Sequence, residues 1–214
     1  MSSQSEDTRI ALAAACAALG LSASGAEPIR LAEKAIWRLP GGVVARVAKA
    51  GQRAETEREL RLARWLADMG LPVVRPHPGV RAMVVACCRP VSFWEELPPH
   101  EHGSVLDVAA LLRQLHALPP PPFPVGRLDP FTRVSQRIDV ADTLTENDRD
   151  WLRDFLRDLQ AAWQDLPAGL PECVVHGDAW AGNVARVFDS GKTLLMDLER
   201  CSQGQPEWDL VSTR

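Results

Sequence analysis

The stretch that decides the fold covers residues 174–210 and reads VVHGDAWAGNVARVFDSGKTLLMDLERCSQGQPEWDL. A short β-rich run at its start leads into His-Gly-Asp at positions 176–178. Two more β-rich runs, 184–188 and 193–196, flank the turn sequence Asp-Ser-Gly-Lys at 189–192. The pattern predicts a polar loop followed by a β-hairpin.

The predicted hairpin has a geometric consequence for its polar ends. A turn centred near Ser190 sets Asn183 roughly opposite Asp197, and paired strands lie about 4.8 Å apart. An amide oxygen and a carboxylate, completed by phosphate oxygens and water, suit Mg²⁺. Asp178 precedes the hairpin on the loop, where a base could meet a substrate hydroxyl. The spacing therefore predicts one base and two metal ligands at a single strand edge.

The N-terminal part reads as a helix followed by a β-β-α-β-β pattern. A helix is expected from Asp7 to Gly20. Two β-rich runs around Pro-Gly-Gly within residues 35–48 predict a hairpin, and residues 55–69 form an amphipathic helix that ends at Gly70. Two more strands are expected at 82–86 and 91–94, joined through Arg89-Pro90.

The C-terminal part turns helical after a boundary near residues 97–99. Two capping-box patterns predict helix starts, one with Ser104 and Asp107 and the other with Thr145 and Asp148. Apolar residues recur at helical spacing after Thr145; they are Trp151, Leu152, Phe155, Leu156, Leu159 and Trp163. We expect the two tryptophans among them to pack in the core.

Composition narrows the class of protein. The chain has 214 residues, a net charge of -4 and a pI of about 5.8, which does not fit a basic nucleic-acid-binding surface. The apolar stretch 10–21 is too short to span a membrane, and Glu6 and Asp7 before it do not fit a signal peptide. The five cysteines lack metal-finger spacing. We therefore expect reduced thiols, a cytoplasmic location, and neither nucleic-acid nor membrane partners.

Three motifs in order resemble a known family. They are His176-x-Asp178-x-x-x-x-Asn183, then Asp197-Leu198-Glu199, then Pro206-Glu207-Trp208-Asp209-Leu210. The chain resembles the aminoglycoside phosphotransferase and choline kinase family, which shares its architecture with protein kinases.

The resemblance implies an α+β, protein-kinase-like fold with two lobes. The N-terminal lobe, residues 1–97, would hold a small antiparallel sheet, one main helix and an extra N-terminal helix. The C-terminal lobe, residues 98–214, would be mostly helical and carry the catalytic loop and the hairpin. Relatives usually continue through several more helices, so we expect this lobe to be incomplete.

The same resemblance implies roles for the motif residues. Asp178 would be the catalytic base, and Asn183 and Asp197 would hold Mg²⁺ on the phosphates. His176 and Asp209 would brace the catalytic loop. Glu199 would either touch the metal or substrate or serve a structural role.

Nucleotide contacts are implied for the first lobe. Arg46 matches the basic residue that contacts the α- and β-phosphates, with Lys49 as its rival, and Glu59 matches its acidic partner. The backbone of the hinge would meet the purine. The hinge residues are Glu95, Glu96 and Leu97, together with Trp94 before them. The turn that would cover the phosphates, residues 31–34 (LAEK), holds no glycine.

The resemblance implies a small-molecule kinase that transfers the γ-phosphate of ATP or GTP to a hydroxyl group. Trp180 stands where protein kinases carry a lysine, which favours a small acceptor. Acidic residues near the expected cleft favour a cationic acceptor such as an aminoglycoside, an amino sugar or a choline-like alcohol. They are Glu95, Glu96, Glu199, Glu207 and Asp209. Trp180 or Trp208 could stack on such a cation.

Two alternatives stay open. The turn without glycine and the early chain end favour a nucleotide-binding module without turnover. A metal-dependent hydrolase would instead use His116, His176, Asp178 and Asp197.

Overall fold

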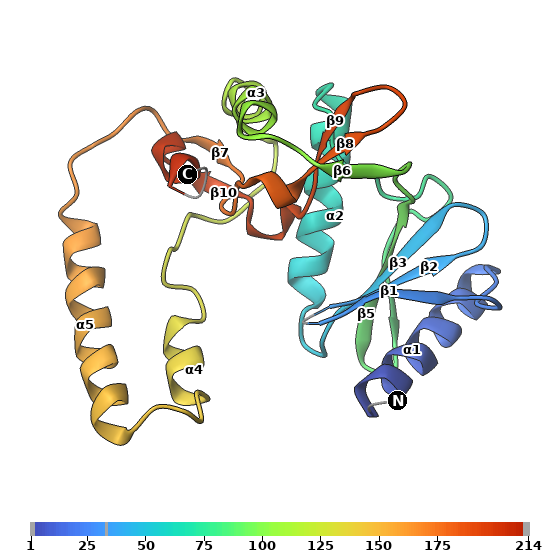
Figure 1. Ribbon diagram of the computed structural model, residues 1–214, viewed down its shortest axis with the longest axis horizontal. Helices are drawn as coiled ribbons and strands as arrows, with labels where there is room; N and C mark the ends of the chain where they lie inside the picture. Colours follow the sequence, from blue (N-terminus) through green and yellow to red (C-terminus); the bar gives the residue numbers. More distant parts are fainter. Residues whose placement is uncertain (1–2, 33, 212–214) are drawn as a thin grey trace.

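The computed structural model describes residues 3–32 and 34–211 (Figure 1). The first part of the chain forms a five-stranded antiparallel sheet with the order β1-β2-β3-β5-β4. Its strands are β1 (Glu27–Leu31), β2 (Ala35–Leu39), β3 (Val43–Val47), β4 (Val84–Ala86) and β5 (Arg89–Glu95).

Helix α1 (Ser3–Leu19) packs against this sheet, as Figure 1 shows. Alternate residues of β2 and β3 are buried, so each strand presents a regular apolar face. Trp37 of β2 and Phe93 of β5 join Leu12 and Cys16 of α1 in one hydrophobic cluster. The predicted N-terminal helix and the 35–48 hairpin are confirmed.

Helix α2 (Arg53–Asp68) belongs to a different hydrophobic cluster. Leu62 and Leu66 on its buried face pack in one core with residues of the C-terminal part, such as Leu111 and Leu195. The chain after α2 pairs directly with the hairpin, because Val74 N donates to Leu195 O at 3.0 Å. The division at residue 97 therefore separates the five-stranded sheet from the smaller sheets, but the hydrophobic cluster that holds α2 spans it, and the division stays a prediction.

As far as residue 211, the second part holds two small sheets and three α-helices. Strands β6 (His100–His102), β8 (Val184–Val187) and β9 (Thr193–Leu195) form one sheet, and β7 (Cys173–Val175) pairs with β10 (Ser202–Gly204). The helices are α3 (Val105–His116), α4 (Val134–Asp139) and α5 (Glu146–Gln164). Short 3-10 helices are η1 (Ala181–Asn183), η2 (Leu198–Arg200) and η3 (Pro206–Leu210). The predicted two-part α+β architecture is confirmed.

The sequence predicted some ends of helices and strands correctly and others wrongly. Both capping boxes form as predicted, at Ser104 with Asp107 and at Thr145 with Asp148. The turn between β4 and β5 was placed wrongly. Cys87 and Cys88 make it, with φ values of 49° and 61°, while Arg89-Pro90 already belong to β5. Strand β1 was not predicted, because EPIRL is short and contains proline.

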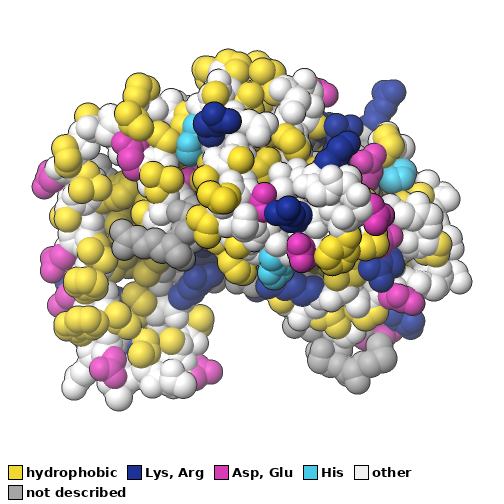
Figure 2. Space-filling model, turned by 45° about the horizontal axis from the view of Figure 1, so that its top comes forward, with side chains coloured by type: hydrophobic (Ala, Val, Ile, Leu, Met, Phe, Trp, Pro, Cys, Tyr) yellow, Lys and Arg dark blue, Asp and Glu magenta, His cyan; other side chains and the backbone are white. Residues whose placement is uncertain are grey.

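The tryptophans of α5 were predicted to pack in the core, and this is wrong for Trp151. Trp151 is 63% exposed and Phe155 46%, and within α5 only Leu156 is buried. The short helix α4 lies beside α5 and is too short to cover its apolar face (Figure 1). Figure 2 shows hydrophobic side chains gathered at the surface on the side of α4 and α5. Trp163 fastens the C-terminal end of α5 through edge contacts with Phe131 and Trp208.

No helix in the described ranges is long and apolar enough to cross a membrane. All five cysteines are free thiols, as predicted, and Cys87 and Cys88 are exposed.

Candidate active site

Asp209 on η3 anchors the loop that follows β7. Its side chain is 1% exposed. Its Oδ2 accepts from the backbone nitrogen of His176 at 2.7 Å and from Nε2 of His116 at 2.9 Å, and its Oδ1 accepts from Gly177 N at 2.8 Å. Two backbone donors and one ring donor are thus satisfied by one buried carboxylate. The structure places Asp209 where the bracing role requires it.

His176 locks the same loop from its ring. The ring is fully buried, and its Nε2 lies 2.8 Å from Met196 O, while Asp178 N donates to its Nδ1 at 3.3 Å. A carbonyl can only accept and an amide N–H can only donate, so the neutral ring with its proton on Nε2 satisfies both bonds. His176 therefore ties the loop to the end of the hairpin.

The hydrolase alternative finds no support in this geometry. His116 forms a hydrogen bond with Asp209 and does not lie beside Asp178 and Asp197. Within residues 3–32 and 34–211, no group of three or more His, Cys, Asp or Glu side chains could hold a metal ion.

Gly177 lets the loop bend past η2. Its φ is 82°, and a Cβ there would lie 2.5 Å from the carbonyl oxygen of Arg200. Only glycine combines that backbone conformation with so close an approach. The position of Asp178 thus depends on the residue before it.

Asn183 and Asp178 are brought together by η1. Asn183 Nδ2 donates to Asp178 O at 2.8 Å and lies 3.5 Å from Asp178 Oδ2. The other end of the amide, Oδ1, makes no hydrogen bond within the described residues and is left for a cation. Asn183 faces Met196 rather than Asp197 across the hairpin, because Met196 N donates to Asn183 O.

Asp197 nevertheless reaches the same cavity. It follows Met196 in a left-handed conformation with φ of 55°, and it lines a cavity of about 320 Å³ together with Asn183 and Arg46. Its carboxylate has no hydrogen-bond or ion-pair partner within the described ranges. Burial raises the pKa of the Asp197 carboxyl, and the carboxylates of Glu199 and Glu59 act in the same direction. An unpaired carboxylate beside an amide oxygen fits a divalent cation.

Arg46 and Glu59 form the predicted pair. Arg46 Nη1 lies 2.7 Å from Glu59 Oε1, and the Glu59 side chain is 3% exposed. The guanidinium also lies 4.2 Å from the centre of the Trp94 ring. The rival Lys49 is exposed at the end of β3, and its backbone nitrogen bonds Gln52. The geometry thus favours Arg46 over Lys49.

Sequence reasoning missed Lys34 as a site residue. Lys34 Nζ lies 2.8 Å from Glu59 Oε2 and 2.8 Å from Glu199 Oε2. Burial opposes its charge, but the two carboxylates outweigh burial and raise the pKa of Lys34. Burial likewise acts to raise the pKa of Glu199, yet Lys34 holds it below its usual value. A lysine at the end of the expected phosphate turn was the available signal; Glu33 in that turn lies outside the described residues.

The hinge residues lie where β5 leaves the sheet. The backbone nitrogen of Glu95 donates to Arg75 O at 2.9 Å, and that of Glu96 donates to Gly42 O at 2.8 Å. Both N–H groups are therefore used within the protein. Contacts from Glu95, Glu96 and Leu97 to a purine stay a prediction. They would use the backbone carbonyl groups of these residues and the remaining groups of Leu97, because the N–H groups of Glu95 and Glu96 already have partners.

Four of the five acids expected to attract a cation have other partners. Glu199 pairs with Lys34, and Glu96 with Arg38. Glu207 accepts from Leu170 N at 2.7 Å, and Asp209 is buried. The structure thus does not gather them into a free acidic pocket.

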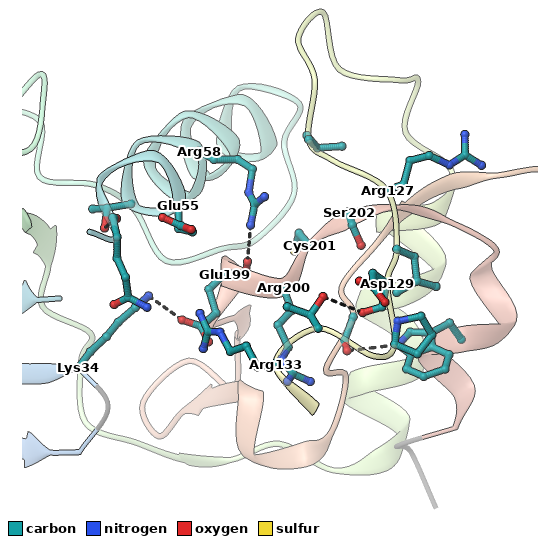
Figure 3. Close-up of a pocket in the computed structure, with 18 residues that line it drawn as sticks. Lys34, Glu55, Arg58, Arg127, Asp129, Arg133, Glu199, Arg200, Cys201 and Ser202 are labelled. Atoms are coloured by element: carbon teal, nitrogen blue, oxygen red, sulfur yellow. Dashed lines mark hydrogen bonds and ion pairs between the residues drawn. The ribbon is translucent and has the colours of Figure 1, made fainter. Parts of the chain in front are cut away.

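A second cavity, of about 270 Å³, lies between α2, η2 and residues 125–133 (Figure 3). Figure 3 shows Lys34, Arg58 and Arg133 pointing toward Glu199 from different segments. Gly177 lines this cavity, while Asn183 lines the first. Asp178 lines neither of these two cavities, but it follows Gly177 and its Oδ2 lies 3.5 Å from Nδ2 of Asn183. Lys34 and Glu199 line both cavities.

Comparison with solved structures supports the fold. Aminoglycoside phosphotransferase APH(3'')-Id from Streptomyces rimosus superposes with a TM-score of 0.71 and 22% identity, covering 94% of this chain and 80% of that chain. An aminoglycoside-3'-phosphotransferase of type VIII gives 0.71 and 22%, covering 97% of this chain and 82% of that one. Choline kinase LicA from Streptococcus pneumoniae gives 0.62 and 17%, covering 94% and 72%. At these identities the likeness shows a shared fold.

A search of curated protein sequences finds no match. The model of the phosphotransferase enzyme family matches residues 32–214, which is most of the chain. The matched region includes all three motifs of the candidate site. This chain belongs to the phosphotransferase enzyme family.

Proposed function

We propose that this chain transfers the γ-phosphate of ATP, or of GTP, to a hydroxyl group of a small molecule. Membership of the phosphotransferase enzyme family makes it a phosphotransferase. One observation carries the finer proposal: Asp178 contacts Asn183, which lines one cavity with Asp197 and Arg46. This contact supports a site in which a proton acceptor would lie next to ligands for a metal and phosphates.

The phosphates would lie in the cavity of Asn183, Asp197 and Arg46. The Asn183 amide oxygen and the Asp197 carboxylate would hold Mg²⁺, which supplies positive charge against the phosphate oxygens. Arg46 is held at the cavity wall by Glu59 and Trp94, so its direction is set before a nucleotide arrives. Phosphoryl transfer depends mainly on such positioning and charge.

Asp178 would orient the acceptor hydroxyl and accept its proton. Its backbone is held on both sides, by His176 Nδ1 at its nitrogen and by Asn183 Nδ2 at its carbonyl oxygen. A fixed backbone limits where the carboxylate can reach. Trp180, two residues on, is 46% exposed and would border the acceptor.

The donor is a nucleoside triphosphate by analogy with proteins of the same fold. The Streptomyces rimosus enzyme has been solved with ADP and streptomycin, and amicoumacin kinase hAmiN with AMP-PNP, Ca²⁺ and Ami. Residues Glu95, Glu96 and Leu97 would meet the purine. The acceptor would be an aminoglycoside, an amino sugar or a choline-like alcohol, in line with the substrates of such enzymes.

A direct test is product detection by mass spectrometry. The purified chain is incubated with Mg²⁺, ATP or GTP, and a panel of streptomycin, glucosamine and choline. A product about 80 Da heavier than one acceptor, absent with Asp178→Asn, supports the proposal. Nucleotide binding without any phosphorylated product, across a wider panel of alcohols, would support the module without turnover instead.

A further inference from the structure

Lys34 joins the two sides of the cleft. It follows the turn between β1 and β2, and its ammonium lies 2.8 Å from Glu59 on α2 and 2.8 Å from Glu199 on η2. The Lys34 side chain is 20% exposed, so it is accessible from the cavity although both its partners are protein carboxylates.

Glu59 does not depend on Lys34 for its charge balance. Its Oε1 binds Arg46 at 2.7 Å, and its Oε2 binds Lys34. A buried carboxylate needs at least one cationic partner, because an unpaired buried charge is strongly destabilising. Since Arg46 supplies that partner, Lys34 can move away without leaving Glu59 unpaired.

The turn before Lys34 cannot hold phosphates by a glycine-rich backbone. Residues 31–34 contain no glycine. The backbone nitrogen of Ala32 is directed at Lys34 O, 3.4 Å away, which closes the turn on itself. Backbone N–H cradles depend on close approach, which glycine permits. A lysine side chain offers a compact charge on a flexible stem in place of such a cradle.

Lys34 also lies on the appropriate wall of the cavity. Arg30, Lys34 and Arg46 line it from the β1–β3 region, and Asn183 and Asp197 line it from the segments around the hairpin. A triphosphate with its cation would therefore meet basic side chains on one side and cation ligands on the other. Glu199, which now holds Lys34, lines the same cavity beside Asp197.

We propose that Lys34 is a second phosphate-binding residue of this site. In the nucleotide-free protein Glu59 and Glu199 hold its ammonium at the cavity, and on binding of a nucleoside di- or triphosphate it turns from Glu199 to the β- or γ-phosphate. The proposal rests on the proposed nucleotide site but concerns a residue outside its motifs.

The test separates phosphate binding from a purely structural bridge. Lys34→Ala, Lys34→Gln and Lys34→Arg are titrated by calorimetry with ATP, ADP and adenosine in Mg²⁺, beside Lys192→Ala, which removes an exposed lysine in the β8–β9 turn. Loss of a charged hydrogen bond weakens binding by about tenfold to a hundredfold. We expect that loss for ATP and ADP in the Ala and Gln variants, unchanged adenosine binding, and near-normal affinity in the Arg and Lys192 variants.

Other outcomes have clear meanings. Equal affinity for ATP in wild type and Lys34→Gln would overturn the role of Lys34 and leave the nucleotide site standing. An equal loss for ATP and adenosine would make Lys34 a structural bridge and also overturn the proposal. No binding of any nucleotide by folded wild type would overturn the proposed function, and the role of Lys34 with it.

Discussion

Asn183 Nδ2 donates a hydrogen bond to the carbonyl oxygen of Asp178 at 2.8 Å. The bond joins the residue proposed as the base to a residue proposed as a metal ligand. Because the acceptor is a backbone carbonyl, a substitution of the Asp178 side chain keeps this bond, whereas a substitution of Asn183 that lacks the amide N–H removes it. Substitutions that preserve side-chain size are the ones that separate the two roles.

Asp178→Asn should abolish most turnover while nucleotide binding persists. The carbonyl that Asn183 binds is unchanged, but an amide cannot accept the proton of the acceptor. General-base loss lowers kcat by about 10² to 10⁴. Steady-state kinetics and nucleotide titration check both halves, with the exposed Asp189→Asn as the matched control. Full turnover in Asp178→Asn would remove this residue from the mechanism.

Glu59→Ala should destabilise the fold. The substitution leaves Arg46 and Lys34 facing each other without the carboxylate between them, at side chains 16% and 20% exposed. Breaking such a pair lowers the free energy of unfolding by about 3 kcal/mol. Urea denaturation measures it, with Glu57→Ala on the exposed side of the same helix as control. A loss no larger than that of the control would show that the cluster contributes little to stability.

Leu156→Ala and Trp151→Ala should differ sharply, although both lie on α5. Leu156 is 6% exposed, and truncation of a buried leucine costs about 2 to 5 kcal/mol. Trp151 is exposed and stacks on Phe155 at the surface, so its loss should cost below about 1 kcal/mol. Denaturation curves of the two variants decide the point. A larger loss for Trp151→Ala would mean that its side chain packs in a core after all.

The cysteines should differ in reactivity. Burial, aided by Asp209 and Glu207, raises the pKa of Cys173 to about 11, and burial also raises the pKa of Cys201. The thiolate is the reactive form, so both stay protonated at pH 8. Iodoacetamide followed by peptide mass spectrometry should label the exposed Cys87 and Cys88 first. The labelling rate of Cys173 should keep rising toward pH 11. Rapid labelling of Cys173 at pH 7 would contradict its raised pKa.

Features encoded locally could be predicted from the sequence. The capping boxes at Ser104 and Thr145, and the hairpin at 184–195, depend on residues within a few positions of one another. The motif order placed Asp178, Asn183 and Asp197 in one region. The register was missed by one residue: Met196 rather than Asp197 faces Asn183, because the turn is centred between Asp189 and Ser190.

Features that depend on distant partners could not be predicted. Periodicity showed which face of α5 is apolar, but not that so little of the described chain covers it. Lys34 meets Glu59 and Glu199 only because a turn, a helix and a 3-10 helix converge. The sequence likewise did not show that most of the acids that favoured a cationic acceptor already have partners in the folded chain. Those partners are Lys34, Arg38 and backbone N–H groups.

Calorimetric titration of the chain with ATP, with and without Mg²⁺, beside Asp197→Ala, tests the central claim most directly. Asp197 has no hydrogen-bond or ion-pair partner among the described residues, so its removal should leave the fold intact, as checked by thermal melting. We expect wild type to bind ATP with Mg²⁺ and to lose about tenfold or more in affinity without it. Asp197→Ala should show the weaker affinity under both conditions. Equal Mg²⁺-dependent binding by wild type and Asp197→Ala would place the metal elsewhere and contradict the site described here.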